Sequence, residues 1–554
     1  MQMAEHRRKG RARGRQVEDT AAADITALLG AMPRRRDLLI EYLHLIQDRY
    51  GCIHSSHVVA LAAELKLAPT EVYEVATFYH HFDVVKDDAP RPPRLTVRVC
   101  ESVSCEMFGA EKLVATLQAE AGAEVRIQRV PCVGRCHAAP VAVVGQRPVE
   151  RATPEAVLAA VARTETAPEP TAHLDYTGYR AAGGYRLLED CVDGRRTRED
   201  IVKELQDSKL RGLGGAGFPA GNKWAILRQQ PSPRLLAVNI DEGEPGTFKD
   251  RHYLERDPHR FLEGMLIAAW AIEAATCYIY LRDEYAAIRE TLLNEISALQ
   301  ANAPCALPAI ELRRGAGAYI CGEESAMIES IEGKRGMPRL RPPYVAQVGL
   351  FGRPTLEHNM ETLFWVREIV ERGAAWFASH GRRERRGLRS FSVSGRVAKP
   401  GVHLAPAGIS VRELIDEYCG GMLPGHEFYG YFPGGASGGI LPAELGDLPL
   451  DFDTLQPHGC FIGSAAVIVL SKHDSARAAA LNAMRFFKHE SCGQCTPCRV
   501  GTDKAVTLME APVWDKPLLQ DLARAMEDAS ICGLGQAAPN PLRCAMRYFP
   551  QEFE

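Results

Sequence analysis

The amino-terminal part of the chain carries a helical pattern of apolar positions. Apolar residues recur at the spacing of one helix face, about 3.6 residues, at Leu38, Leu39, Tyr42, Leu43 and Ile46. The pattern predicts a helix-rich segment from about Ala22 to Phe82, with a further helix starting at Pro69. A proline-rich stretch, Ala89 to Arg94, closes this helical bundle.

After this stretch the pattern alternates between strand and helix. Alternating apolar residues predict a strand from Leu95 that ends at Cys100, followed by a helix from Gly109 to Glu120. Two more strands are predicted, at Glu124 to Val130 and at Val141 to Val144. We therefore expect a small α/β domain with cysteines at its strand ends.

A run rich in Pro and Glu, Thr164 to Ala172, predicts an exposed linker and a domain boundary. From Tyr176 to Gly381, helices alternate with apolar runs such as Leu235 to Ile240, which predicts an α/β domain. The most apolar long window, Gly264 to Leu281, is interrupted by Glu273. That window is typical of a buried helix with a following strand, so we expect no membrane span.

The last third of the chain changes character twice. The region from Ser390 to Asp474 has short strands, many Gly and Pro residues and one predicted helix at Val411 to Tyr418, which indicates a small β-rich domain. From Ala476 onward the pattern is helical again, and Cys492 lies within it.

The stretch from Leu210 to Trp224 holds five glycines within ten positions, so its backbone is free to adopt positive φ and to approach a ligand closely. Its Gly212, Gly214 and Gly217 satisfy the spacing G-x-G-x-x-G, but that fingerprint requires a strand immediately before it. Glu199 to Leu210 instead predicts a helix, which argues against an ordinary dinucleotide-binding motif. A phosphate-binding turn and a plain glycine-rich turn both remain open.

Two acidic loops accompany the glycine stretch. Asn239 to Gly246 follows an apolar strand-like run, where carboxylates accept hydrogen bonds from ribose or ribityl hydroxyls. Gly315 to Glu324 has the same mixture of glycine and carboxylate. Each loop alone is equally typical of a solvated turn, but three such loops in one domain favour a nucleotide or flavin site.

Four of the 16 cysteines form an amino-terminal group. Its pairs are Cys100-x4-Cys105 and Cys132-x3-Cys136, with 26 residues between them. Thiolates in two closely spaced pairs bind an iron–sulfur cluster or a structural zinc. Zinc ribbons prefer C-x2-C in both pairs, so we favour a [2Fe–2S] cluster, with zinc and inert core cysteines as alternatives.

A second group, Cys492, Cys495 and Cys498, has the spacing C-x2-C-x2-C that suits a [4Fe–4S] cluster, with zinc as the alternative. The fourth ligand must be distant, and Cys532 in a glycine-rich loop is favoured over Cys544, which lies in a predicted helix. The scattered cysteines are expected to be mostly core residues: Cys52, Cys191, Cys277, Cys305, Cys321, Cys419, Cys460 and Cys544.

Composition narrows the classes of function. Lys and Arg number 66 and Asp and Glu 70, a net charge of -4, which argues against nucleic acid as a partner. The basic arm at the amino terminus is not followed by an apolar segment, so we expect no signal peptide. We expect a soluble, cytoplasmic protein of several domains.

Five motifs, read together, resemble a known family. They are GLGGAGFPAGNKW, NIDEGEPGTFKDR, GAGAYICGEES with PRLRPPY, PTLEHNMETL, and SCGQCTPC with ICGLG. Residues 176–554 resemble the flavin-binding subunit of respiratory complex I and its relatives, the diaphorase subunits of NAD-reducing hydrogenases and of NAD-dependent formate dehydrogenases. Residues 20–160 resemble the family's separate thioredoxin-like [2Fe–2S] subunit, so the chain resembles a fusion of the two.

The resemblance implies a multidomain α/β protein. The implied order is a basic disordered arm (1–20), a helical bundle (21–90), a thioredoxin-like [2Fe–2S] domain (91–163), a linker (164–175), an FMN- and NAD-binding domain (176–388), a ubiquitin-like β-grasp domain (389–474) and a helical [4Fe–4S] domain (475–554).

It also implies cofactors and the residues that hold them. The FMN positions are Gly212, Gly214, Lys223, Asn239, Asp241, Gly322, Glu323 and Asn359, with Gly217 and Glu242 as neighbouring cofactor contacts. Phe218, Glu244 and Glu324 match positions that contact NAD(H), the two glutamates at the centre of catalysis. The [2Fe–2S] ligands would be Cys100, Cys105, Cys132 and Cys136, and the [4Fe–4S] ligands Cys492, Cys495, Cys498 and Cys532.

Departures from the family pattern indicate a branch. Leu213 stands where an arginine is usual and His358 where an asparagine is usual, and both resemble the formate dehydrogenase branch. Ile226 and Tyr344 replace a more aromatic surface for the adenine, and Arg341 replaces a common lysine. The implied partner is a molybdenum- or tungsten-containing formate dehydrogenase subunit with further Fe–S clusters, because this chain offers no pterin site. Complex I and hydrogenase subunits are the alternatives.

Overall fold

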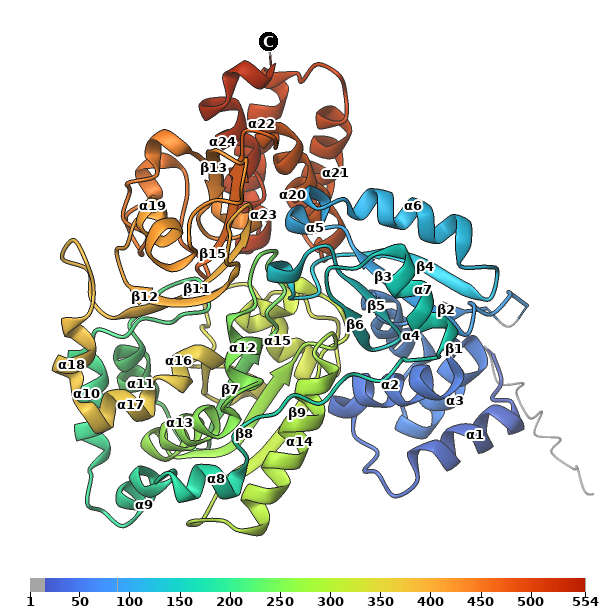
Figure 1. The fold of residues 1–554 in the computed structure, drawn as a ribbon. Coiled ribbons are helices and arrows are strands. Elements are labelled where there is room, and N and C mark those ends of the chain that lie inside the picture. Colours follow the sequence, from blue (N-terminus) through green and yellow to red (C-terminus); the bar gives the residue numbers. More distant parts are fainter. Residues whose placement is uncertain (1–14, 87, 554) are drawn as a thin grey trace, which may run out of the picture. The chain divides into compact units, whose positions relative to one another are not determined.

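The computed structural model describes residues 15–86 and 88–553 (Figure 1). Residues 1–14 of the predicted basic arm lie outside this range, and the first described helix, α1, begins at Asp19, just before the predicted start of the bundle. The described chain forms two compact units. One comprises the residues up to Pro92 together with Glu332–Arg335, and the other comprises the remainder.

The first unit is the predicted helical bundle. Its elements are α1 (Asp19–Leu29), α2 (Leu39–Tyr50), β1 (Ile53–His54), α3 (Ser55–Leu65), α4 (Pro69–Phe78) and β2 (Val84–Val85). The predicted apolar stripe is buried from Leu39 onward, whereas Leu38 is half-buried because it belongs to the 3-10 turn before α2. Pro69 starts α4, and Glu71 accepts a hydrogen bond from the Ala68 N–H at 3.1 Å. The short parallel pair of β1 and β2 was not predicted.

The second unit begins with a four-stranded sheet in the order β4-β3-β5-β6. Its elements are β3 (Leu95–Cys100), α5 (Val103–Met107), α6 (Ala110–Glu120), β4 (Val125–Val130), β5 (Ala142–Val144), β6 (Arg147–Val149) and α7 (Pro154–Ala162). Strands β3 and β4 are parallel, while β5 and β6 run antiparallel to their neighbours. The predicted linker contains no helix or strand between Ala162 and Tyr176.

A fully parallel sheet in the order β10-β7-β8-β9 follows. Its strands are β7 (Arg234–Ile240), β8 (Ala274–Leu281), β9 (Ala309–Arg314) and β10 (Thr355–Asn359). The helices of this part are α8 (Tyr176–Ala181), α9 (Arg186–Val192), α10 (Arg198–Ser208), α11 (Ala220–Arg228), α12 (Lys249–Leu254), α13 (Pro258–Ile272), α14 (Ala286–Ala301), α15 (Glu324–Ile331), α16 (Met360–Phe364), α17 (Val366–Arg372) and α18 (Ala374–Ser379).

The strand order fixes where loops meet. The chain proceeds from β7 through β8 to β9 on one side and returns to place β10 on the other side of β7. Ligands of such sheets bind at the carboxyl ends of the strands where the order reverses. Here that point lies between β7 and β10, whose residues Asn239 and Asn359 are register partners.

The predicted buried helix and strand are α13 and β8. α13 packs against β7 and β8, and Glu273 ends it in the left-handed conformation, at φ 57°. The polar residue that interrupts the apolar window therefore marks the turn between the two elements. None of the described helices is long and apolar enough to cross a membrane.

The β-rich region forms a mixed sheet in the order β12-β11-β15-β13-β14. Its elements are β11 (Leu388–Gly395), β12 (Gly401–Pro406), α19 (Val411–Glu413), β13 (Phe428–Phe432), β14 (Leu441–Pro442) and β15 (Ala466–Ser471). The predicted helix at 411–418 is α19 continued by a π-helical turn at Leu414–Tyr418. β11 and β15 are parallel, and the other pairs are antiparallel.

The chain ends in the predicted helices. They are α20 (Ala476–Glu490), α21 (Thr496–Met509), α22 (Lys516–Ala529), α23 (Gly533–Ala537) and α24 (Asn540–Tyr548). α20 packs against α21 and α24, and α21 against α22, so the group seen in red in Figure 1 shares one core with the β-rich sheet.

Candidate functional site

A cavity of about 1970 Å³ opens beside the carboxyl ends of β7 and β10. Its walls come from the glycine stretch, both acidic loops, the loop 456–464 and the carboxyl-terminal helices. Sites for one small molecule usually measure about 300–1,000 Å³. The cavity therefore has room for more than one nucleotide-sized ligand.

The glycine stretch forms one wall between α10 and α11. As predicted, a helix precedes it rather than a strand. The Gly212 N–H donates to the Phe218 carbonyl at 2.8 Å, which closes the loop on itself. Gly217 has φ +67°, and a Cβ there would lie 2.5 Å from the ring of Phe452. Only glycine fits this position without strain.

The acidic loop after β7 presents an unsatisfied group to the cavity. Asn239 donates to the Gly322 carbonyl at 2.9 Å and accepts from the Asp241 N–H at 3.0 Å, which joins the two acidic loops. Oδ2 of Asp241 is buried and has no hydrogen-bond partner among the described residues. Burial raises the pKa of Asp241 well above its usual value. This orphaned oxygen fits a ligand that brings hydroxyl or N–H donors.

Glu242 lines the same cavity but has partners for both of its oxygens. It accepts from the backbone N–H groups of Asp250 and Arg251 at 2.7 and 3.2 Å and from the Tyr285 hydroxyl at 2.7 Å. Burial, and then the charge of Asp250, raise the pKa of Glu242 to about 7. These contacts fix the loop onto the start of α12, so Glu242 holds the wall in position.

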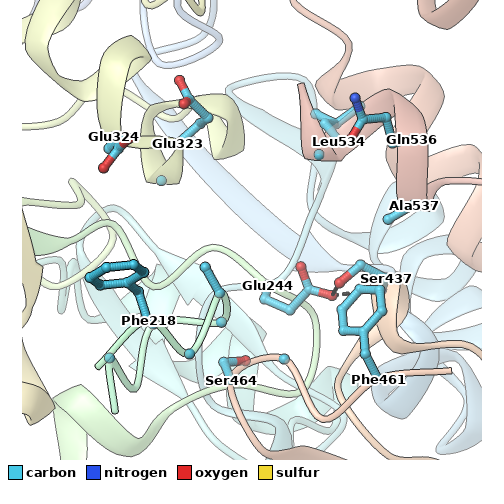
Figure 2. Close-up of a pocket in the computed structure, with 18 of the residues that line it drawn as sticks. Phe218, Glu244, Glu323, Glu324, Ser437, Phe461, Ser464, Leu534, Gln536 and Ala537 are labelled. Atoms are coloured by element: carbon cyan, nitrogen blue, oxygen red, sulfur yellow. Dashed lines mark hydrogen bonds between the residues drawn. The ribbon is translucent and has the colours of Figure 1, made fainter. Parts of the chain in front are cut away.

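Glu244 lies deeper along the loop, as Figure 2 shows. Its Oε1 accepts from the Ser437 N–H at 2.7 Å and from the Ser437 hydroxyl at 2.8 Å. Its other oxygen accepts from the Tyr319 hydroxyl. Burial raises the pKa of Glu244. Ser437, which the sequence did not identify, belongs to the β-rich region and thus ties that region to the cavity.

The second acidic loop carries two carboxylates with different surroundings. Glu323 accepts from the N–H groups of Ser325 and Ala326, at 3.0 and 2.9 Å, at the start of α15. Glu324 forms ion pairs with Lys223 at 3.5 Å and with Arg341 at 3.0 Å. Glu324 therefore lies between two cations at the edge of the cavity.

Lys223 reaches into the cavity wall from α11. Its ammonium lies 3.1 Å from Glu357 as well as 3.5 Å from Glu324. Burial opposes its charge, but the two glutamates raise the pKa of Lys223 above the ordinary value. A fixed cation of this kind suits an anionic part of a ligand.

Apolar side chains are exposed along the rim. Phe218 is 49%, Ile226 44% and Tyr344 57% accessible, although each lines the cavity. Exposed flat rings at a cavity mouth provide stacking surfaces for the rings of a ligand. All of the predicted cofactor residues outside the cysteine groups line this one cavity.

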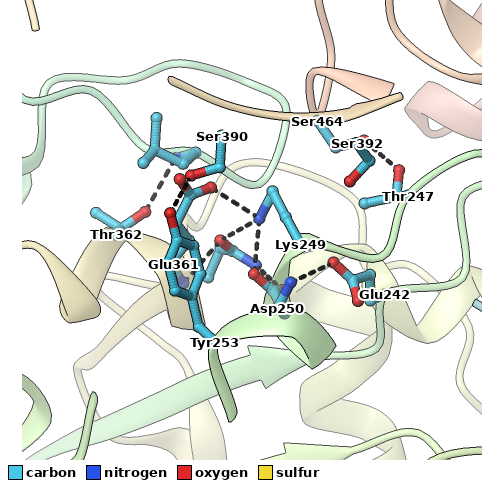
Figure 3. A network of polar contacts seen from close by, with 12 residues as sticks. Glu242, Thr247, Lys249, Asp250, Tyr253, Glu361, Thr362, Ser390, Ser392 and Ser464 are labelled. Carbon is cyan, nitrogen blue, oxygen red and sulfur yellow. Dashed lines mark hydrogen bonds and ion pairs between the residues drawn. The ribbon is translucent and has the colours of Figure 1, made fainter. Parts of the chain in front are cut away.

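A buried charge network that the sequence did not reveal lies beneath the acidic loop (Figure 3). Lys249 donates to Asp250 at 2.7 Å and to Asn359 at 3.1 Å, and its ammonium lies 3.1 Å from Glu361. Asn359 in turn donates to Asp250 at 2.6 Å. The network fixes the predicted residue Asn359 between α12 and α16. No local signal marks it, because Glu361 and Lys249 are distant in sequence.

The amino-terminal cysteines converge at one point. The thiol of Cys100 hydrogen-bonds with those of Cys105 and Cys132, and the sulfur atoms of Cys132 and Cys136 lie 3.2 Å apart. All four side chains are buried. Four sulfur donors around one point fit a tetrathiolate [2Fe–2S] cluster.

The carboxyl-terminal cysteines lie at two facing helix starts. Cys495 precedes α21, and Cys498 in its first turn hydrogen-bonds with it. Cys532 precedes α23, and burial and the neighbouring Cys492 raise its thiol pKa to about 12. This donor set fits a [4Fe–4S] cluster. Cys544 lies apart from the group, with its sulfur 3.5 Å from that of Cys460.

Three family models match the chain. The thioredoxin-like [2Fe–2S] ferredoxin model matches residues 25–165, the Nuo51 FMN-binding domain residues 205–368, and the NADH-ubiquinone oxidoreductase-F iron–sulfur binding region residues 478–554. The three matches are consecutive, as a fusion requires.

Whole proteins match as well. The F 2 polypeptide of the NADH-quinone oxidoreductase of Rhizobium meliloti (strain 1021) is 42% identical over 399 residues, which cover 69% of this chain and 94% of that protein. Flavoprotein 1 of the mitochondrial NADH dehydrogenase [ubiquinone] of Dictyostelium discoideum is 42% identical over 397 residues, 68% of this chain and 82% of that protein. A crystal structure of an NAD+-reducing [NiFe]-hydrogenase in the H2-reduced state covers 94% of both chains, with a TM-score of 0.83 and 32% identity.

These matches agree with the geometry. The cavity offers a cradle for two nucleotide-sized ligands, and each cysteine group offers four thiols. The chain is a fusion of thioredoxin-like [2Fe–2S], FMN-binding and [4Fe–4S] domains, and its cofactors are FMN, NAD, one [2Fe–2S] cluster and one [4Fe–4S] cluster. It belongs to the family of NADH-oxidising FMN and iron–sulfur subunits of complex I and of NAD-reducing hydrogenases.

Proposed function

We propose that this chain is the diaphorase subunit of a cytoplasmic NAD-dependent formate dehydrogenase, which exchanges electrons between NAD(H) and a partner subunit. One observation carries the diaphorase role. The cavity that holds the glycine and acidic loops is also lined by Gly533 and Leu534, the two residues that follow Cys532. A flavin in this cavity therefore lies close to a proposed ligand of the [4Fe–4S] cluster.

We assign the walls of the cavity to two ligands. FMN is held by the glycine stretch and by the groups at the β7 and β10 ends: Gly212, Gly214, Gly217, Lys223, Asn239, Asp241, Gly322, Glu323 and Asn359. NAD(H) lies toward the exposed rim, against Phe218 and Tyr344, with its polar groups near Glu244 and Glu324. Glu242 supports the flavin loop through its contacts with α12.

FMN supplies two-electron exchange with nicotinamide and one-electron exchange with iron–sulfur clusters. The protein's part is orientation, because hydride transfer between bound rings needs close and correct placement. Ser437 and Tyr319 hold Glu244 with three hydrogen bonds, which fixes its carboxylate at the cavity wall. Asp241 gives the ligand an acceptor that no residue of the described chain satisfies.

The sheet order of residues 388–471 supports the ubiquitin-like β-grasp assignment. A parallel pair, β11 and β15, forms the centre, β12 and β13 flank it in antiparallel direction, and β14 is at the edge. We propose domain limits at 21–90, 91–163, 176–388, 389–474 and 475–554, in agreement with the element bounds.

Two partner classes are supported by different observations. Leu213 and His358 resemble the formate dehydrogenase branch. Both are buried, with the Leu213 N–H donating to Thr362 at 2.9 Å and His358 accepting from the Trp224 indole at 2.7 Å. The coverage of 94% of both chains in the hydrogenase comparison supports a NAD-reducing hydrogenase as the second candidate.

The partner is tested by purifying the chain with its native assembly and measuring metals and substrates. Formate-dependent reduction of NAD+ together with molybdenum or tungsten supports the formate branch. Hydrogen-dependent reduction together with nickel supports the second candidate and refutes the first. An assembly that oxidises NADH with quinone and contains none of these metals refutes both.

The NAD(H) roles are tested by Glu244→Ala and Glu324→Ala. Loss of a charged hydrogen-bonding group costs about 1.5–3 kcal/mol, so we expect kcat/KM for NADH with ferricyanide to fall about 10- to 150-fold. FMN content should stay at one per chain. The control is Glu417→Ala, which removes an exposed ion pair with Arg382 and should leave kcat/KM unchanged. Loss of flavin from both test variants would refute the assignment.

A further inference from the structure

Two thiols from distant parts of the chain meet at the cavity wall. Cys460 lies in the loop before β15 and Cys544 in the middle of α24, and their sulfur atoms are 3.5 Å apart. Their residues are 1% and 2% accessible, yet both line the cavity. They belong to neither cysteine group assigned to a cluster.

The backbone makes room for this pair. At Gly439, with φ +83°, a Cβ atom would lie 2.6 Å from the Cys460 sulfur and 3.1 Å from the Cys544 sulfur. Any side chain at this position would push the sulfur atoms away. The absence of a side chain at Gly439 therefore permits the close approach of the two sulfur atoms.

The surroundings of the pair differ from those of other buried thiols. For Cys277 and Cys419, burial alone raises the thiol pKa to about 12. Cys544 instead has a lowered pKa, because Cys460 hydrogen-bonds to it and Arg547 and Arg543 lie near. The thiolate is the nucleophile in disulfide exchange, so Cys544 is the attacking sulfur and Cys460 the resolving one.

We propose that Cys460 and Cys544 are a reversible dithiol–disulfide site that responds to small organic disulfides entering the cavity and weakens NAD(H) binding when oxidised. The Cys544 thiolate attacks the small disulfide, forming a mixed disulfide and releasing one thiol. Cys460 then loses its proton, attacks the Cys544 sulfur and releases the second thiol. The protein loses two hydrogens, and the small disulfide becomes two thiols.

The link to NAD(H) rests on the function proposed above. Bond formation brings the two sulfur atoms closer than 3.5 Å, which draws α24 toward the loop of Cys460. Asn540, at the start of α24, donates to the Ser437 carbonyl at 3.0 Å, and Ser437 donates twice to Glu244. Oxidation therefore displaces the group that holds Glu244.

The experiment treats the holoenzyme anaerobically with bis(2-hydroxyethyl) disulfide, then alkylates free thiols and maps peptides by mass spectrometry. We expect a peptide pair joined through Cys460 and Cys544, lighter by two hydrogens and separated again by dithiothreitol. Cys419 should be alkylated as in untreated protein. Two thiols that stay free, or a mixed disulfide that persists in the wild-type chain, would overturn the proposal.

Variants and kinetics complete the test. Cys460→Ala should accumulate the mixed disulfide on Cys544, whereas Cys544→Ala should leave Cys460 unmodified. Oxidation should raise the KM for NADH of the wild-type chain about fivefold or more and leave that of Cys544→Ala unchanged. A disulfide that forms without changing KM overturns the switch. Absence of NADH turnover in untreated enzyme refutes the proposed function instead, while peptide mapping still decides the thiol chemistry.

Discussion

Replacing Lys249 by methionine tests whether the buried charge network holds the flavin wall together. The ammonium of Lys249 lies within 3.1 Å of Asp250, Asn359 and Glu361, and the side chains of Lys249, Asp250 and Glu361 are only 2%, 1% and 2% accessible. Methionine keeps the length of the side chain but removes the cation, leaving two carboxylates buried without it. Breaking a buried ion pair in this way costs about 3–5 kcal/mol.

The assay must be local, because a chain of several domains does not unfold in one step. Amide hydrogen exchange in α12 and α16, the two helices that the network joins, reports the free energy of local opening. Each 1.36 kcal/mol changes the opening equilibrium about tenfold. The expected loss therefore accelerates exchange about one hundred- to several thousand-fold in these two helices.

Lys472→Met is the matched control. Lys472 pairs with Glu427 on the surface, where the two side chains are 64% and 70% accessible. An exposed pair contributes about 1 kcal/mol or less, so exchange near Lys472 should change about fivefold at most. If Lys249→Met also stays within about fivefold of the wild-type chain, the network does not stabilise the wall and the reasoning fails.

Other outcomes follow from the same structure. Cys532→Ser should abolish the electron paramagnetic resonance signal of the reduced [4Fe–4S] cluster, whereas Cys544→Ser should retain it; the opposite pattern refutes the ligand assignment. Gly217→Ala places a Cβ 2.5 Å from a phenylalanine ring at φ +67° and should weaken FMN binding at least about tenfold in equilibrium dialysis. Gly194→Ala, at φ +77° with no atom within 4 Å, should bind FMN normally. Burial raises the pKa of Glu242 to about 7, so native protein holds a proton that the unfolded chain releases near pH 4.5, and stability falls as pH rises between these values. Glu242→Gln should reduce the drop in melting temperature across that window, and an unchanged drop would contradict the assignment.

Local patterns in the sequence predicted those parts of the molecule that depend on short spacing. The helix before the glycine stretch, the strand ending at Cys100 and the helix following Cys495 are each set by residues within one or two turns of each other. The C-x2-C-x2-C spacing likewise brings its three cysteines close together in one short segment. These features require no knowledge of how distant segments meet.

Contacts between distant segments were not predictable in the same way. Lys249 and Glu361 become neighbours only because β10 returns beside β7, and Ser437 meets Glu244 only because the β-rich sheet closes against the cavity. The pairing of Cys460 with Cys544 depends on the same kind of packing. None of these pairs has a periodicity or spacing that a single sequence displays.

The contacts of Glu244 explain why the flavin domain and the cluster domain are joined rigidly. Hydride transfer requires a fixed distance between nicotinamide and flavin, while electron transfer requires the cluster to stay near the flavin. Asn540 of α24 holds Ser437, and Ser437 holds Glu244, so the same hydrogen bonds that fix the proposed hydride site also fix the helices behind Cys532. A domain movement that opened one distance would open the other. The chain therefore couples the two distances through one set of contacts, and the thiol pair beside Asn540 lies where a small change of geometry acts on both.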